Sequence, residues 1–134
     1  MKHKWPSAFK NFLPEELACK QSGGYAFQLG FPEKLQALRD AYGHPIVSTS
    51  CCRSEEYNKS LPNSSDISLH IYDKKRRKGI GTCAIDVKIT DSVLRHRFLK
   101  YALQLGWSCY FIGGNPMYIH CDMRTLLGED AKFW

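Results

Sequence analysis

CAIDVKITDSVLRHRFLKYALQLGWSCYFIGGNPMYIHCD, residues 83–122, decides the fold, because it contains a strand, a helix and a hairpin in succession. Residues 83–89 alternate in the way that is typical of a strand. Thr90 or Asp91 can cap a helix with apolar residues at helical spacing, which ends at Gly106. Residues 108–112 and 117–122 predict two further strands, joined as a hairpin by the turn formers of residues 113–116.

The upstream residues add helices and one more strand. Residues 9–19 predict a short helix that starts near Pro14, and residues 32–42 predict a second helix capped by Gly43. Residues 45–50 predict a strand, and residues 68–72 are expected to be extended. With no internal repeat or linker, we expect residues 1–134 to form a single small α+β domain whose helices pack on a mainly antiparallel sheet.

The composition limits the classes of protein to which this chain can belong. The chain has 134 residues, 43% of them hydrophobic, which suits one domain with an ordinary core. No window reaches the ~20 apolar residues of a membrane span, and the N-terminus has no apolar run behind its positive charges, so we expect no membrane association and no export signal.

A formal net charge of +6 favours anionic partners: nucleic acid, acidic lipid headgroups or the anionic polymers of bacterial walls. Much of the excess lies in Lys74–Lys78, within a predicted basic loop over residues 71–82. A run of this kind is most often a solvated loop. Few aromatic residues interleave with these charges, so a nucleic-acid partner is not expected.

Six cysteines are compatible with a disulfide framework in a small secreted protein. Without an export signal, reduced thiols are the favoured interpretation. No Cys-x-x-Cys pair is present, so a structural thiolate zinc site has little support. Strand alternation directs Cys83 and Cys121 away from their polar neighbours, which favours burial as small apolar residues.

The candidate metal ligands are His70, Asp86 and His120, which lie on or beside predicted strands. A hydrolytic zinc site uses three protein ligands of this kind and leaves one position for water. Spacing alone does not select them, because no local motif fixes two ligands on one element. A lone histidine on a strand is more often a packing or surface residue.

Residues 68–70, 84–86 and 118–122 resemble the Ser-x-His, Ala-x-Asp and x-x-His-x-Asp blocks of the zinc D-alanyl-D-alanine carboxypeptidase family, the M15 peptidases. Residues 9–19 and 35–42 are similar to the family's first two helices, and residues 46–58 to its strand and arginine turn. The resemblance covers nearly the whole chain. It implies a fold of the hedgehog and D-alanyl-D-alanine peptidase type.

The resemblance also implies roles. One Zn²⁺ is held by His70, Asp86 and His120, while Arg53 reaches the substrate's carboxylate or carbonyl oxygen, which an arginine fork suits well. Ser68 and Tyr118, inside the matching blocks, are expected to contact substrate. The alternative for Arg53 is a surface salt bridge to Glu55 or Glu56.

The chain departs from the family's pattern in three ways. The basic loop 71–82 is an insertion between His70 and Asp86, which is tolerated if it projects away from the metal. The acid or histidine that relatives place shortly before the last ligand is replaced by Met117 and Tyr118, so Asp122 is the expected general base, or else a partner that orients His120. Cys51-Cys52 replaces Gly-Tyr, and a nucleophilic role for Cys52 would need a histidine base.

We therefore expect a zinc metallopeptidase that cuts the peptidoglycan stem peptide with water as nucleophile, as a D-alanyl-D-alanine carboxypeptidase or an L-alanyl-D-glutamate endopeptidase. The lack of an export signal and of a wall-binding module favours a monomeric phage or prophage lysin that stays cytoplasmic until released. The alternative is an inactive domain that keeps the fold and binds wall or a protein. A nucleic-acid binder built on the basic loop is a third, weaker hypothesis.

Overall fold

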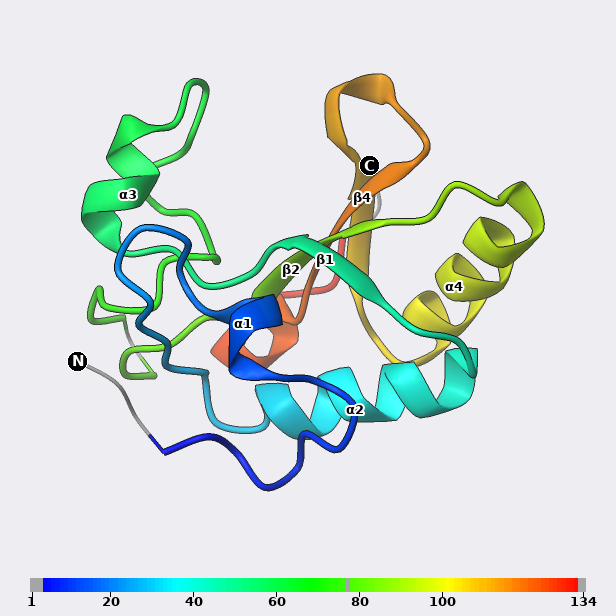
Figure 1. Ribbon diagram of the computed structural model, residues 1–134, viewed down its shortest axis with the longest axis horizontal. Coiled ribbons are helices and arrows are strands. Elements are labelled where there is room, and N and C mark those ends of the chain that lie inside the picture. Colours follow the sequence, from blue (N-terminus) through cyan, green and yellow to red (C-terminus); the bar gives the residue numbers. More distant parts are fainter. Residues whose placement is uncertain (1–3, 77, 133–134) are drawn as a thin grey trace.

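Four strands form one antiparallel sheet at the centre of the computed structural model, which describes residues 4–76 and 78–132 (Figure 1). They are β1 (Val47–Ser50), β2 (Ala84–Lys88), β3 (Ser108–Phe111) and β4 (Tyr118–Asp122), in the order β1-β2-β4-β3. Each neighbouring pair is antiparallel. The fold class predicted from the sequence, an α+β domain on an antiparallel sheet, is confirmed.

The helices lie around this sheet. They are α1 (Pro14–Leu17), α2 (Phe31–Tyr42), α3 (Glu55–Ser60) and α4 (Ser92–Gln104), with 3-10 turns η1 (Ile112–Gly114) and η2 (Arg124–Leu127). Helices α2 and α4 contact each other through Tyr42 and Phe98, whose ring centroids are 5.4 Å apart. The predicted caps are present: Gly43 ends α2 with a positive φ, and the Asp91 side chain accepts from Leu94 N–H at the start of α4.

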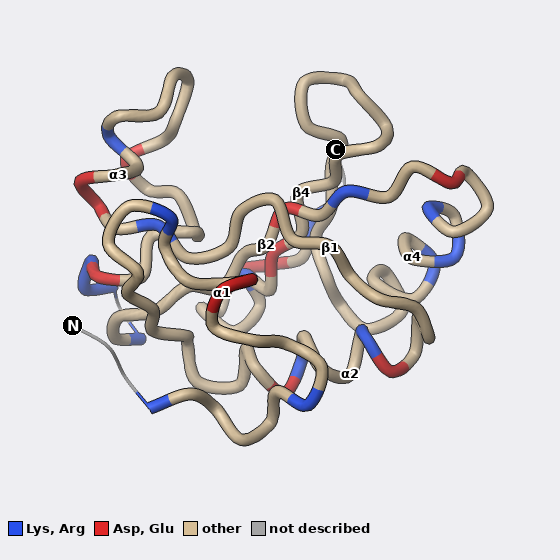
Figure 2. The backbone as a smooth tube through the Cα atoms, in the orientation of Figure 1, with Lys and Arg blue, Asp and Glu red and all other residues tan. Residues whose placement is uncertain are grey.

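The two faces of the sheet differ in chemistry. Alternation places a row of fully buried apolar side chains on one face, where they join the hydrophobic core: Ile85, Val87, Ile119 and Cys121. The other face carries the polar residues of β2 and β4, and Figure 2 shows acidic positions along these strands near the centre of the molecule. The sheet therefore presents a polar face on strands that are held rigidly by the core.

All six cysteines are buried free thiols. Cys109 and Cys121 face each other across β3 and β4 with their sulfur atoms 3.4 Å apart. Burial raises the pKa of the Cys121 thiol well above its ordinary value, and the neighbouring Cys109 adds to the shift. The buried thiols pack as small apolar groups.

Residues 68–72 are not extended, so this prediction is wrong. The backbone turns at this point, because Ser68 N–H donates to Ser65 and Ile71 N–H donates to Ser68. Only Ile71 forms an isolated bridge, with Arg53. Local hydrogen bonding of serines competes with strand pairing here, since the Ser68 hydroxyl also accepts from His70 N–H.

The predicted basic loop follows this turn, and one of its residues, Arg77, lies outside the described residues. Arg76 donates to the carbonyl oxygens of Gly81 and Ser68, both at 2.6 Å, so its guanidinium fastens the loop to the turn that carries His70. Lys74 pairs with Glu55 of α3 at 3.4 Å. These two basic side chains therefore bind the protein itself.

Candidate metal centre

Three side chains from distant segments meet on the polar face of the sheet. His70 comes from the turn, Asp86 from β2 and His120 from β4, directly opposite Asp86 in the strand pairing. One ligand atom from each lies within 4.8 Å of the other two. The Asp86 Oδ1 atom is 3.1 Å from His70 Nε2 and 3.0 Å from His120 Nδ1. The fold thus brings together the three predicted ligands.

An acceptor behind each imidazole sets its orientation. His70 Nδ1 lies 2.7 Å from the carbonyl oxygen of Cys51, and His120 Nε2 lies 2.8 Å from Asp122 Oδ2. When these nitrogens donate, the lone pair of the opposite nitrogen in each ring points at Asp86. Such an acceptor behind each histidine is what metal sites use to fix the tautomer.

The donor set fits a divalent cation. Two imidazole lone pairs and a carboxylate oxygen converge on one region, where they repel each other unless a proton or a cation lies between them. All three residues are buried, yet the region borders a cleft. Two histidines and one carboxylate form a ligand set that zinc uses in hydrolytic sites. The described residues contain no other group of this kind.

The protonation states agree with this arrangement. Burial lowers the pKa of His70 against the opposing effect of Asp86. Burial also acts to lower the pKa of His120, but hydrogen bonds to Asp122 and Asp86 outweigh it and raise the value. Burial acts to raise the pKa of Asp86, but hydrogen bonds from His120 and His70 hold it well below its usual range. Without metal, His120 therefore takes up a proton more readily than His70 does.

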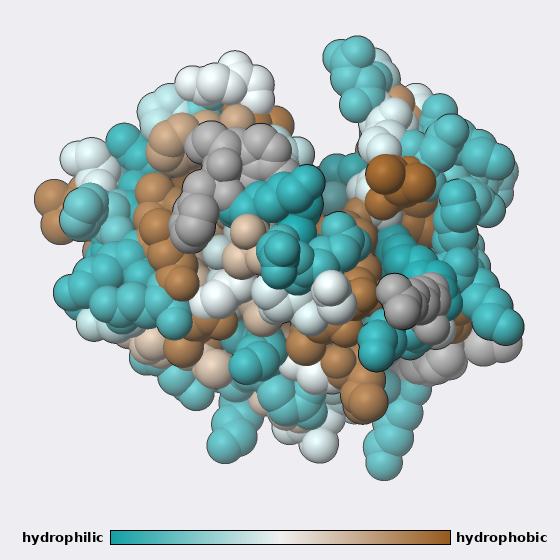
Figure 3. All heavy atoms as spheres, turned by 180° about the vertical axis from the view of Figure 1, so that it is seen from behind, coloured by the Kyte–Doolittle hydropathy of each residue, from teal (hydrophilic) through white to brown (hydrophobic). Residues whose placement is uncertain are grey.

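The polar group lies at the floor of a cleft of about 900 Å³. One wall is formed by the loop that follows α3, and the other by the hairpin of β3, η1 and β4 together with η2. These walls are the two lobes at the top of Figure 1, and the view from behind shows a notch between them (Figure 3). An extended ligand in this cleft would pass directly over the three side chains.

Arg53 lies beside the group, on the turn between β1 and α3. Its Nη2 atom is 3.3 Å from Asp86 Oδ2, while Nε donates to Ser50 and Nη1 to Asn58. The alternative partners considered from the sequence were Glu55 and Glu56, but Arg53 pairs with Asp86, and Glu55 pairs with Lys74. Arg53 therefore lines the cleft as a tethered cation.

The comparison with protein families agrees with this geometry. A family model described as Peptidase M15 matches residues 10–122, which is most of the chain. The chain belongs to the peptidase M15 family. No curated protein and no solved structure matches it at a significant level. The M15 match spans all three side chains of the group, so a peptidase with a buried His-Asp-His site able to bind a metal is the supported description.

Asp122 of this M15 peptidase is fully buried and accepts bonds on both oxygens. Arg124 donates through Nε to Oδ1 at 2.8 Å and through Nη2 to Oδ2 at 2.7 Å, and His120 Nε2 contacts Oδ2. Burial acts to raise the pKa of Asp122, but the bonds from Arg124 and His120 lower it. This environment matches the orienting role for Asp122 that the sequence left open.

The two residues expected to contact substrate occupy different places. Ser68 lines the cleft, and its hydroxyl is engaged by His70 N–H in the turn. Tyr118 is paired with Lys88, whose ammonium lies 5.6 Å from the centre of its ring, and it does not belong to the described cleft lining. A substrate contact by either residue stays a prediction.

Sequence reasoning missed Tyr110. This residue lies opposite His120 in the pairing of β3 with β4 and lines the cleft. Burial raises the pKa of its phenol, and Asp86 and Asp122 add to the shift, so the group is protonated near neutral pH. Strand alternation offered a signal, since Tyr110 and Cys109 must face opposite sides, but the register that places it at His120 is not a local property.

No helix in the described part of the chain is both long enough and apolar enough to cross a bilayer. The three side chains of the metal centre all come from the one chain.

Proposed function

We propose that this chain is a zinc-dependent peptidase that hydrolyses a peptide bond in the peptidoglycan stem peptide, as a D-alanyl-D-alanine carboxypeptidase or an L-alanyl-D-glutamate endopeptidase. The observation that carries the proposal is the convergence of His70 Nε2, His120 Nδ1 and Asp86 Oδ1 at the floor of an open cleft. The M15 match supports the peptidase class.

We assign the three converging side chains as the ligands of the ion. Zinc held there supplies a Lewis acid that polarises a carbonyl group and makes water a better nucleophile near neutral pH. Cys51 and Asp122 hold the two imidazoles in the required tautomers. The protein's own contribution is thus a set of lone pairs fixed before the ion arrives, which lowers the reorganisation needed for binding.

Arg53 is assigned to the substrate. Its side chain is 16% exposed and lies at the edge of the group, where a carboxylate or the oxygen of a scissile carbonyl would come within reach. Bonds to Ser50 and Asn58 fix the plane of the fork. A fixed, bidentate cation of this kind recognises carboxylate geometry better than a lysine.

The base that takes the proton from water is assigned to Glu129. Asp122, the residue nominated from the sequence, already has both oxygens engaged by Arg124 and His120, so we propose that it positions His120 instead. Glu129 is the remaining carboxylate among the described residues that line the cleft, and it is exposed. A carboxylate within reach of the attacking water is what general-base catalysis requires.

Release of peptides from purified peptidoglycan tests the function. We expect products that disappear after chelation, return with zinc, and are not formed by a His120→Ala variant that has lost the metal. Stem-peptide substrates ending in D-alanyl-D-alanine, or containing the L-alanyl-D-glutamate bond, identify the bond. A protein that binds zinc and wall but releases no product with any of them would support the inactive binding domain instead.

A further inference from the structure

A continuous row of side chains crosses the polar face of the sheet. The strand pairing aligns Ser50 of β1 with Asp86, Asp86 with His120, and His120 with Tyr110 of β3. Two members of this row belong to the metal centre, and Ser50 accepts a hydrogen bond from Arg53. Tyr110 is therefore the member of the row without an assigned role.

The Tyr110 ring packs on a ring of the metal centre. Its centroid is 4.6 Å from that of His120, with 28° between the planes, which is a stacked pair. His70 approaches the same imidazole at 5.3 Å and 67°, as an edge contact. The His120 ring thus has an aromatic neighbour on one face and its partner ligand at another side, which restrains its rotation.

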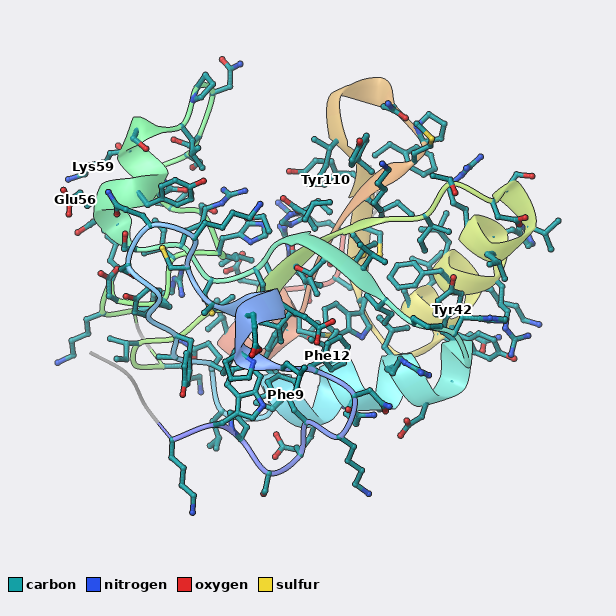
Figure 4. All side chains as sticks on the ribbon, in the orientation of Figure 1. Phe9, Phe12, Tyr42, Glu56, Lys59 and Tyr110 are labelled. Atoms are coloured by element: carbon teal, nitrogen blue, oxygen red, sulfur yellow. The ribbon has the colours of Figure 1, made fainter. Side chains whose placement is uncertain are left out.

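Tyr110 also borders the cleft. The residue is 37% exposed although its ring is stacked, and it lines the same cleft as Arg53 and Asp86. Figure 4 shows Tyr110 at the base of the hairpin lobe, on the side that faces α3. A phenol is a hydrogen-bond donor at neutral pH, so this wall offers a donor where the peptide must pass.

We propose that Tyr110 contacts the substrate, and that its hydroxyl donates to the carbonyl oxygen of the scissile bond as that oxygen gains negative charge. This inference rests on the proposed peptidase function. Arg53 approaches Asp86 from the β1 side of the row, and Tyr110 approaches His120 from the β3 side. The reacting carbonyl would then have a donor from each side of the metal centre, in an arrangement built before substrate binds.

The test compares Tyr110→Phe with the wild-type enzyme. Phenylalanine keeps the ring that stacks on His120 and removes only the hydroxyl. We expect kcat on a D-alanyl-D-alanine or L-alanyl-D-glutamate stem peptide to fall by about 100-fold, with KM changed by less than about threefold, because the donor acts mainly in the transition state. Zinc content and melting temperature should match the wild type.

A second measurement does not depend on turnover. A phosphinate analogue of the cleaved dipeptide imitates the tetrahedral, negatively charged transition state, and its affinity can be measured by calorimetry. Tyr110→Phe should bind it at least about tenfold more weakly than the wild type, whereas both should bind the intact peptide alike. The matched control is Tyr101→Phe, which removes a phenol from α4, where the ring lies under Arg97 and away from the cleft lining.

The possible results distinguish a failure of the Tyr110 assignment from a failure of the proposed peptidase function. Wild-type values of kcat and phosphinate affinity in Tyr110→Phe would overturn the inference and leave the peptidase function intact. A loss of activity accompanied by loss of zinc would show that the residue only supports the metal centre, which also overturns it. A zinc-loaded wild type that neither cuts a stem peptide nor binds the phosphinate would reject the proposed function and this inference together.

Discussion

The charge on Asp122 is what the orienting role requires, because it makes the carboxylate a strong acceptor for His120 Nε2. Replacing Asp122 by Asn removes that charge and leaves the Arg124 guanidinium facing a neutral amide. We expect the affinity for zinc to fall about 10- to 100-fold, as is usual when the partner of a ligating histidine is lost. Competition with a chromogenic chelator measures this. Asp130→Asn, at an exposed position, is the control, and equal affinities in both variants would contradict the role.

Protons compete with the metal at His120. In the metal-free protein the raised pKa of His120 stabilises the fold below its unfolded value near 6.5, and this contribution is lost as the pH rises through the folded value. His70, whose pKa is lowered, is already neutral in that window. We expect zinc affinity to rise about tenfold per pH unit below the folded pKa of His120 and to level off above it, with about one proton released per ion. Titration calorimetry in buffers of different ionisation enthalpy counts that proton, and an affinity independent of pH would contradict the assignment.

The assignment of Glu129 predicts a defect in turnover alone. Glu129→Gln keeps the shape of the side chain but cannot accept a proton, so kcat should fall about 10²- to 10⁴-fold with zinc affinity unchanged. Steady-state kinetics on a stem peptide measures this. Asp130→Gln provides a control at the next position, which is also exposed. If Glu129→Gln keeps wild-type kcat, another group accepts the proton.

The three side chains that meet at the candidate metal centre, His70, Asp86 and His120, could be selected from the sequence because each lies in a short block that resembles the family. The true partners of Arg53 and Asp122 were not, since they depend on distances between segments that the sequence does not give. Tyr110 was missed for the same reason, because only the register of β3 against β4 places it on His120.

Helix α4 begins at a cap that the sequence already indicates. Asp91 Oδ1 accepts from Leu94 N–H at 2.9 Å, which satisfies a backbone donor of the first turn. Asp91→Ala should lower the free energy of unfolding by about 1 kcal/mol, while Asp91→Ser, which can still cap, should lose less. Urea denaturation measures both. Because α4 contributes no side chain to the metal centre, zinc affinity should stay at the wild-type value, and a loss of affinity would show that α4 is coupled to the site.

Elements with strong local signals were predicted well. The α4 segment combines a cap, an apolar stripe and a terminal glycine within its own residues, and the β3–β4 hairpin follows from its turn formers. The stretch at residues 68–72 was predicted incorrectly because the hydroxyls of Ser68 and of the preceding Ser65 bond to the local backbone. The order β1-β2-β4-β3 could not be read from these local patterns, since it depends on pairing between strands far apart in the sequence.

At the scale of the whole molecule, the N-terminal segment is fastened to the strand that leads into β2. Gln28 N–H donates to Thr82, and Thr82 N–H donates to Ala26. This contact requires a glycine at Gly81, where an added Cβ would lie 2.4 Å from the Phe27 carbonyl carbon and φ is +129°. Gly81→Ala should therefore destabilise the fold by more than about 3 kcal/mol.

Gly79 is the matched control for this position. Its φ of +95° is also positive, but nothing lies within 4 Å of an added Cβ, so Gly79→Ala should cost only about 1 kcal/mol. Thermal denaturation of both variants distinguishes the clash from the backbone strain. Equal losses would mean that the close approach of the N-terminal segment contributes nothing.

The order of the strands also separates the proposed metal ligands from the proposed substrate contact. Asp86 and His120 are on the two inner strands, β2 and β4, whereas Tyr110 is on β3, at an edge. Edge strands have a neighbour on one side only, and they open in brief local fluctuations that leave the interior closed. If β3 opens in this way while β2 and β4 stay paired, Tyr110 would move away from the substrate and turnover would stop. The metal ion would stay bound, because two of its proposed ligands lie on the strands that remain closed and none lies on β3.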